Sequence, residues 1–254
     1  MTFPSGTLCK QLANFRDFWL GYNADPETGE SEGLVLYRSG IPSAMYNGVL
    51  RVTPGVDLGI AFTAAARRLA GGPSVWWVGP DSDERTARYL GARGLTRAAT
   101  MTVMEIDLAD VTDVRVPEGI TISRVEAPGG TEAWVRAYAP RLGVAPDAVD
   151  ALVSRHEERN DVPGAFTRFE ARDGEEIVGT SSMLDLHGVA GVYAVTTAES
   201  HLTRGVGTAL TSAALHLGRE RGRTLGTLQT ATAASLYRRM GFRTVSDYQV
   251  FTRQ

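Results

Sequence analysis

The segment HLTRGVGTAL, residues 201–210, is the most informative stretch of the sequence. It follows a predicted strand, Val189–Thr196, and opens a helix with an apolar stripe. The first backbone amides of a helix have no partner within it, and the positive end of the helix dipole lies at the same place. Gly205 and Gly207 let a ligand approach the backbone without a Cβ in the way, and Arg204 adds a fixed charge. The segment predicts a pyrophosphate cradle, although alone it also fits a tight strand-to-helix turn that needs glycine.

A dinucleotide-binding loop is the first alternative for these glycines. That loop has the pattern Gly-x-Gly-x-x-Gly near the start of a βαβ unit. Here Leu210 holds the place of the third glycine, and the preceding strand belongs to an antiparallel meander. The sequence therefore favours another kind of phosphate site.

A second motif, SLYRRMGF at residues 235–242, lies downstream of the loop. Together the two motifs resemble the GNAT superfamily of acyl-CoA-dependent N-acyltransferases. Gly205 and Gly207 match its signature Arg/Gln-x-x-Gly-x-Gly/Ala, and Tyr237 stands in the tyrosine position of its Tyr-x-x-x-Gly-Phe segment. Val195-Thr196-Thr197 resembles the strand end that pairs with the pantetheine arm of CoA. The resemblance covers roughly residues 118–254.

The resemblance implies an N-acetyltransferase with acetyl-CoA as cosubstrate. An amine attacks the thioester carbonyl directly, and Tyr237 acts as the general acid that protonates the leaving thiolate. The acceptor is expected to be a small-molecule amine or a protein amino group. No metal is expected, and no general base is assigned, although Glu170, Asp185 and His187 lie on the central meander. The residues expected to bind the cofactor are Val195, Thr197, Leu202, Thr203, Arg204, Gly205, Val206, Gly207, Thr208 and Thr230.

Two departures from the family pattern support a different function. Leu202 stands where the family usually has Arg or Gln, and Thr230 replaces a common asparagine. A non-catalytic acyl-CoA-binding or regulatory protein is therefore the alternative. The intact Tyr237 argues for the enzyme.

The chain divides at a polar segment, Asp107–Gly119, which reads as a linker. We expect domains at 1–110 and 118–254, with an α/β (α+β) fold in which each is a GNAT-like mixed, mostly antiparallel sheet flanked by helices. In the first half we expect strands at Gly48–Val52, Ser74–Val78 and Ala98–Ile106, and helices at Val56–Leu69 and Glu84–Leu90. In the second half we expect strands at Ile120–Val125, Phe166–Arg172, Glu176–Leu184, Val189–Thr196, Thr224–Thr230 and from Phe242, and helices at Thr131–Tyr138, Pro146–Glu158, from the glycine loop to Arg221, and at Ala233–Met240.

The two halves end alike, each with a strand, a long helix, a strand, a short helix that closes on glycine, and a strand. The first half has Thr53-Pro54-Gly55 where the second has its glycine loop. We therefore expect a degenerate copy that does not bind CoA and helps to shape the acceptor cleft. Trp19, Trp76 and Trp77 are expected to be packing residues.

Composition excludes several other classes of protein. Lys10 is the only lysine in the 254 residues, so a Gly-Lys-Ser/Thr phosphate loop cannot be written, and a Schiff-base lysine would have to be Lys10. A net charge of −3 argues against general nucleic-acid binding, yet residues 204–254 carry eight arginines against Glu220 and Asp247. The single cysteine, and the lack of a signal segment or a long apolar run, favour a cytoplasmic protein without a membrane partner. A homodimer is left open.

Overall fold

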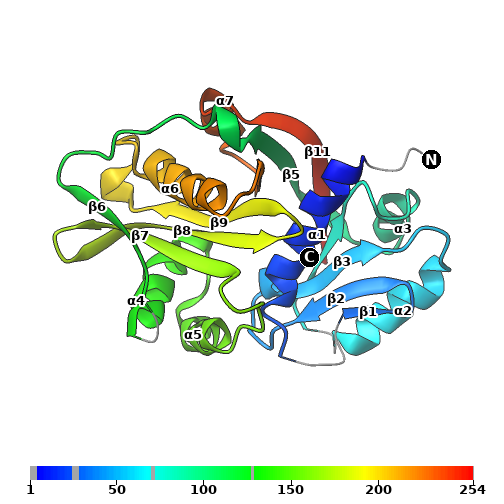
Figure 1. The fold of residues 1–254 in the computed structure, drawn as a ribbon. Coiled ribbons are helices and arrows are strands. Elements are labelled where there is room, and N and C mark those ends of the chain that lie inside the picture. The colour runs from blue at the N-terminus through cyan, green and yellow to red at the C-terminus, as the bar shows by residue number, and fades with distance from the viewer. Residues whose placement is uncertain (1–4, 25–28, 70–71, 127–128, 254) are drawn as a thin grey trace. The chain divides into compact units, whose positions relative to one another are not determined.

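The computed structural model describes residues 5–24, 29–69, 72–126 and 129–253 (Figure 1). The chain forms two compact units, residues 1–103 with 245–254 and residues 104–244. The division expected from the sequence assigned residues 245–254 to the second half. They lie in the first unit because Gln249–Thr252 of β11 (Arg243–Thr252) pairs antiparallel with Val75–Val78 of β4. The last strand therefore belongs to the first unit because of its backbone pairing, although it comes at the end of the chain.

The second unit is built on a meander of antiparallel strands. β6 (Ile120–Arg124), β7 (Phe166–Asp173), β8 (Glu176–Leu186) and β9 (Val189–Thr197) pair in that order, and β10 (Leu225–Thr230) lies parallel to β9. The dipeptides Asp173-Gly174 and His187-Gly188, which are hairpin signals in the sequence, form tight turns between these strands, and Gly174, His187 and Gly188 all take positive φ. The result is the predicted mixed, mostly antiparallel sheet.

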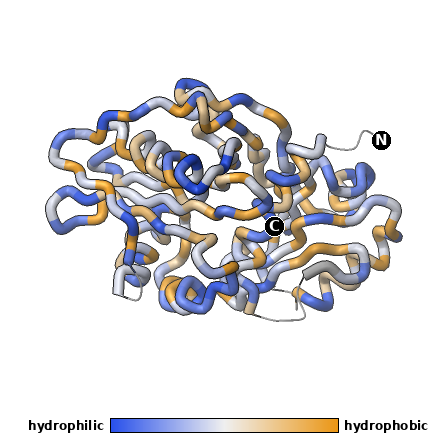
Figure 2. The backbone as a smooth tube through the Cα atoms, viewed as in Figure 1, coloured by the Kyte–Doolittle hydropathy of each residue, from blue (hydrophilic) through white to orange (hydrophobic). Residues whose placement is uncertain are grey.

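Helices cover both faces of this sheet (Figure 1). α6 (Val206–Glu220) packs on one face of β8 and β9, and α4 (Gly129–Tyr138) packs on β8 from the other side, with α5 (Val149–Glu157) beside it. Figure 2 shows hydrophobic segments along the central strands, with hydrophilic ones common in turns and at helix ends. The helix expected at Pro146–Glu158 is divided into a 3₁₀ turn, η4 (Pro146–Ala148), and α5.

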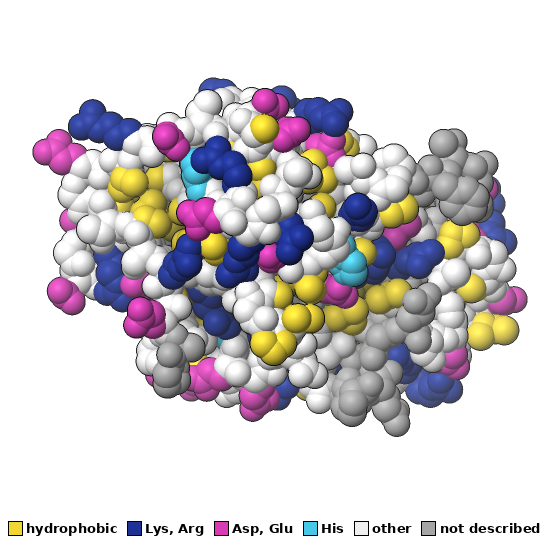
Figure 3. Space-filling view, in the orientation of Figure 1, with side chains coloured by type: hydrophobic (Ala, Val, Ile, Leu, Met, Phe, Trp, Pro, Cys, Tyr) yellow, Lys and Arg dark blue, Asp and Glu magenta, His cyan; other side chains and the backbone are white. Residues whose placement is uncertain are grey.

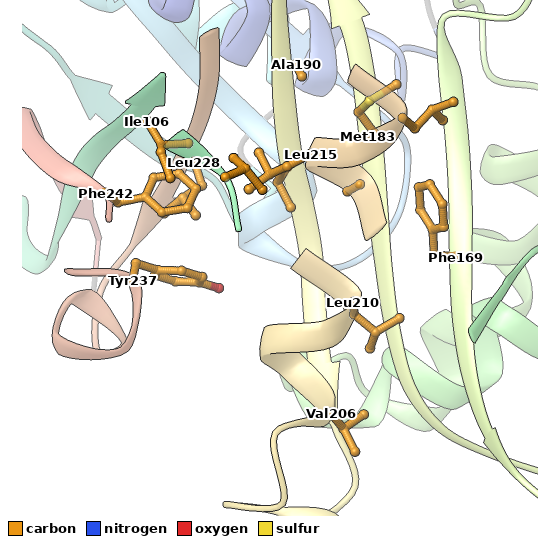
Figure 4. Packing of buried hydrophobic residues seen from close by; sticks show 14 of the residues in the cluster. Ile106, Phe169, Met183, Ala190, Val206, Leu210, Leu215, Leu228, Tyr237 and Phe242 are labelled. Carbon is orange, nitrogen blue, oxygen red and sulfur yellow. The ribbon is translucent and has the colours of Figure 1, made fainter. Parts of the chain in front are cut away.

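The core under α6 supplies much of the stability of this unit. Leu210, Leu215 and Met183 are fully or almost fully buried, together with Ile106 from the end of β5 (Figure 4). Each such side chain contributes about 1.5–3 kcal/mol on burial. Gly218 and Gly226 are needed here, since a Cβ on either would lie 2.5 Å from a neighbouring side-chain atom.

The first unit repeats this arrangement of elements. β1 (Gly29–Ser31), β2 (Leu34–Arg38) and β3 (Asn47–Val52) are antiparallel neighbours, and β3 lies parallel to β4 (Val75–Val78). The order β3, α2 (Leu58–Arg68), β4, α3 (Thr86–Ala92), β5 (Thr96–Asp107) matches the order β9, α6, β10, α7 (Ala234–Arg239), β11. In each series a long helix joins the one parallel strand pair, which confirms the predicted duplication of architecture.

Among the α-helices and strands of the described residues, α1 (Gly6–Leu20), β1 and β2 were not predicted. α1 places Phe15 and Trp19 in an aromatic cluster with Trp77, where ring centroids lie 5.0–5.7 Å from the Trp77 ring. Trp77 also donates to the hydroxyl of Tyr37 at 3.1 Å. Trp19, Trp76 and Trp77 are buried in this unit, as expected for packing residues.

Candidate functional site

The strands β9 and β10 part partway along their length. Their parallel register runs from Val189↔Leu225 to Gly191↔Thr227, whereas β9 continues to Thr197 and β10 to Thr230. The part of β9 beyond the ladder includes Val195-Thr196-Thr197, the strand end that the family resemblance relates to the pantetheine arm. The backbone beyond this point lies outside the β9–β10 ladder, where an extended ligand can pair with it.

A bulge in β9 accompanies the parting of the strands. Thr180↔Thr196 and Ser182↔Tyr193 are successive pairs, so β9 carries an extra residue there, and Ala194 takes a φ of +50°. The Thr180 hydroxyl lies 3.0 Å from the Ala194 carbonyl oxygen, to which it donates, and 2.7 Å from the Thr196 hydroxyl. These buried contacts hold a strained conformation beside Val195, one of the expected cofactor residues.

The N-terminus of α6 is open for a ligand. Gly205 is the N-cap, with a φ of +89° and no side-chain capping bond, and the first bond into the helix is from Ala209 N to Gly205 O at 3.0 Å. The amides of Val206, Gly207 and Thr208 therefore lack an intrahelical acceptor. A Cβ on Gly207 would lie 3.3 Å from Thr197 Oγ1, so this helix end lies against the end of β9. The predicted loop and strand-end residues thus come together.

The loop before α6 is exposed but anchored. Leu202 is 54% exposed, Thr203 takes a φ of +64°, and Arg204 is exposed without an ion pair among the described residues. His201 is buried, and its ring nitrogens lie 2.8 Å from Ser200 Oγ and 3.0 Å from Asp173 Oδ2. His201 therefore ties the loop to the β7–β8 turn, a role that the sequence did not indicate.

Tyr237 lies on α7, with 7% of its surface exposed. Its ring packs edge-to-face on Phe242 at 5.6 Å, and its hydroxyl is directed toward α6 (Figure 4). Burial raises the pKa of Tyr237, and a side-chain hydrogen bond with Thr211 offsets part of that rise. Thr211 Oγ1 donates to Gly207 O at 2.8 Å. Thr211 was not predicted, although its place one helical turn after Gly207 on the same face was a usable signal.

Thr230, the remaining predicted cofactor residue, has a local role. Its hydroxyl accepts a hydrogen bond of 2.9 Å from Ala233 N, at the turn that leads into α7. It therefore supports the helix that carries Tyr237. Its place at the end of β10 also puts it at the parted strand ends.

The basic C-terminal segment is spread over the unit rather than gathered at the loop. Figure 3 shows Lys and Arg side chains around α6 on the face in view. Near the C-terminal end of that helix, Arg219 and Arg221 donate to backbone carbonyls, and Arg223 pairs with Asp185 at 2.5 Å. Arg204 is the arginine of this segment that lies within the loop.

The carboxylates considered as bases are engaged in ion pairs. Glu170 binds Arg172 at 2.6 Å, and Asp185 binds Arg223. His187 takes a φ of +58° in the turn before β9. The described residues contain no group of three or more His, Cys, Asp or Glu side chains suited to a metal ion, and no described helix is long and apolar enough to span a membrane.

Comparison with known proteins gives a consistent result. Residues 166–244 match the family model of the acetyltransferase (GNAT) domain. A comparison with curated proteins returned no match.

Solved structures resemble the chain over nearly its whole length. A GCN5-related N-acetyltransferase from Kribbella flavida has a TM-score of 0.71 at 16% identity, covering 99% of this chain and 96% of its own. A tandem GNAT protein from the clavulanic acid biosynthesis pathway has a TM-score of 0.61 at 17% identity, covering 96% and 94%. A GCN5-related N-acetyltransferase-like protein from Streptococcus suis has a TM-score of 0.61 at 12% identity, covering 98% and 97%. Residues 166–244 therefore match a GNAT acetyltransferase domain, and the chain shares the fold of GCN5-related N-acetyltransferases, a tandem GNAT protein among them.

Proposed function

We propose that the chain transfers an acetyl group from acetyl-CoA to an amine acceptor. The observation that carries this proposal is the combination, in one unit, of parted strands β9 and β10 with the uncapped N-terminus of α6 beside them. The parted strands offer backbone groups to a pantetheine arm. The open helix end offers amides and a positive dipole to a pyrophosphate.

The loop residues fit a bound diphosphate. Gly205 and Gly207 leave room next to the backbone, and Arg204 is free of ion pairs within the described chain. The amides of Val206, Gly207 and Thr208, with the Thr208 hydroxyl, would hold the phosphate oxygens. Leu202 and Thr203 would contact the phosphate through their backbone groups, since neither side chain is charged. Val195 and Thr197 would flank the pantetheine arm.

The proposed chemistry is a direct transfer without an acyl-enzyme. The acceptor nitrogen attacks the thioester carbonyl carbon, a carbon–nitrogen bond forms, and the carbon–sulfur bond breaks. Tyr237 gives its phenolic proton to the departing thiolate, and the proton lost by the acceptor passes to solvent. A phenol is protonated at neutral pH, and burial, which raises the pKa of Tyr237, keeps the proton available for transfer.

The first unit is not assigned a CoA site. The helix equivalent to α6 is α2, whose first amides are capped: Asp57 Oδ1 accepts from Gly59 N at 2.8 Å and Ile60 N at 3.0 Å. Asp83 Oδ2 accepts from Gly55 N at 2.9 Å in the preceding loop. Carboxylates therefore occupy the donors that a phosphate would need, and they repel it.

The experiment is acetyl-CoA binding by calorimetry together with thiol release on a panel of small amines and amino-terminal peptides. Binding with turnover on at least one acceptor supports the enzyme. Binding without turnover on any acceptor favours the alternative, a non-catalytic acyl-CoA-binding or regulatory protein, for which Leu202 and Thr230 are the supporting residues. Absence of binding would contradict both.

A further inference from the structure

A cavity of about 370 Å³ lies within the first unit. The end of α2 and the following residues form one side of it, β4 contributes Trp76, and the end of β11 contributes Thr252 and Arg253. Small-molecule sites begin at about 300 Å³. The cavity is therefore of ligand size.

Most of the residues that line this cavity are apolar. The rings of Phe62 and Trp76 are stacked with centroids 5.6 Å apart and 20° between their planes. Leu69 and Leu95 also line the cavity, and their side chains are 7% and 6% exposed. Ala66 also lines the cavity, and its single methyl group leaves the space open. A ligand here would bury carbon against carbon.

One charged side chain lines the cavity. Thr252 Oγ1 donates to Ser74 O at 3.3 Å and lies 3.4 Å from Arg253 O, so its hydroxyl is engaged. Arg253 is exposed, and within the described chain no ion pair involves it. The described lining holds no carboxylate, imidazole or thiol, so the cavity has the chemistry of a binding site rather than a catalytic one.

We propose that this cavity binds a small apolar carboxylate. Its carbon body would pack against Phe62, Trp76 and the two leucines, and its carboxylate would pair with the Arg253 guanidinium. The site is not a second CoA site, because it lies at the C-terminal end of α2, away from the end that Asp57 caps. All its lining residues belong to the first unit, whereas the residues of the proposed acetyl-transfer site belong to the second.

The test uses phenylacetate, the isosteric neutral phenylacetamide and the cationic phenethylamine, each titrated by ligand-observed NMR on the full chain. We expect saturable binding in the order phenylacetate, phenylacetamide, phenethylamine. Arg253→Gln should weaken phenylacetate about threefold to fivefold, the size of an exposed ion pair, and leave phenylacetamide unchanged. Arg238→Gln, an exposed arginine of the second unit, is the matched control.

Ala66→Phe fills the cavity and should abolish binding of all three probes, with folding checked by circular dichroism. Acetyl-CoA binding, measured in parallel, should be unchanged in both first-unit variants. No saturable binding of phenylacetate, or equal affinity in Arg253→Gln, would overturn the proposal. A folded Ala66→Phe variant that still binds would do so as well.

Discussion

Thr211 on α6 lies close enough to Tyr237 on α7 to lower the pKa of the phenol, and so it offsets part of the rise that burial causes. While Tyr237 is neutral, the Thr211 hydroxyl donates its proton to Gly207 O at 2.8 Å. When Tyr237 ionises, the Thr211 hydroxyl can turn to donate to the phenolate. Thr211 thus contacts the loop proposed to hold the pyrophosphate and also influences the proposed general acid.

Replacement of Tyr237 directly tests its proposed role as the general acid. Tyr237→Phe keeps the ring contact with Phe242 and removes the proton donor. We expect kcat to fall by about 10²–10³, within the range for general acid catalysis, with acetyl-CoA affinity nearly unchanged. Steady-state thiol release and calorimetry measure the two quantities. An unchanged kcat would remove Tyr237 from the mechanism.

Thr211→Val keeps the shape of the side chain and removes the hydroxyl. The hydrogen bond with Thr211 lowers the pKa of Tyr237, so its loss should raise that pKa further. An acid is active while protonated, so the alkaline fall in kcat should move to higher pH. We also expect kcat near neutral pH to drop about tenfold. Thr211→Ser should restore both the rate and the position of the alkaline limb, whereas a merely packing role would give the same profile for all three proteins.

Gly205 and Gly222 form a matched pair at the two ends of α6. Their φ angles are +89° and +76°, and a Cβ on Gly222 meets nothing within 4 Å, while one on Gly205 meets only Pro117 at 3.9 Å. Alanine at either position should destabilise the unit by about 1–2 kcal/mol. Only Gly205→Ala should also raise the KM for acetyl-CoA. The backbone at residue 205 would shift to relieve the strain, and the loop amides would then point in a different direction. Equal KM values in the two variants would argue against the loop as the phosphate site.

The sequence predicted the fold of the second unit closely, because its evidence was local. Apolar periodicity located α6, and the dipeptides Asp173-Gly174 and His187-Gly188 located the hairpins. It did not predict α1, or that β11 would pair with β4, since strand pairing depends on contacts far apart in the chain. The same reason explains the differing place of residues 245–254.

For the site, sequence located the glycine loop and Tyr237 but not what connects them. Two features of the site depend on side chains from different elements. They are the bulge at Ala194, which Thr180 holds, and the effect of Thr211 on the pKa of Tyr237. Charge was a weaker guide than its sequence position suggested, because Arg219, Arg221 and Arg223 bind protein groups at the far end of α6. The number of arginines in a segment therefore does not show which of them face the proposed phosphate site.

Arg204 is the arginine of that segment proposed to meet the pyrophosphate. Arg204→Gln should raise the KM for acetyl-CoA about threefold to tenfold and make it less sensitive to salt, with kcat at saturation unchanged. Arg238→Gln, exposed on α7, is the control for loss of one positive charge and should leave KM unchanged. An equal rise in both would assign the effect to overall charge.

His156 gives the second unit a dependence on acid. It is buried, its Nε2 lies 2.6 Å from the Tyr138 hydroxyl, and burial, then Arg168 and Arg159, lower its pKa well below 6.5. As the pH falls below about 6.5, His156 becomes protonated in the unfolded chain but stays neutral in the folded unit. The free energy of unfolding therefore decreases as the pH falls. Between pH 7.5 and 5.5 this group should cost about 1.4 kcal/mol. Urea unfolding of the wild type and His156→Gln at both pH values measures it: the variant is less stable at pH 7.5, and its loss on acidification is smaller by that amount. Equal losses in the two proteins would show that another group carries the dependence.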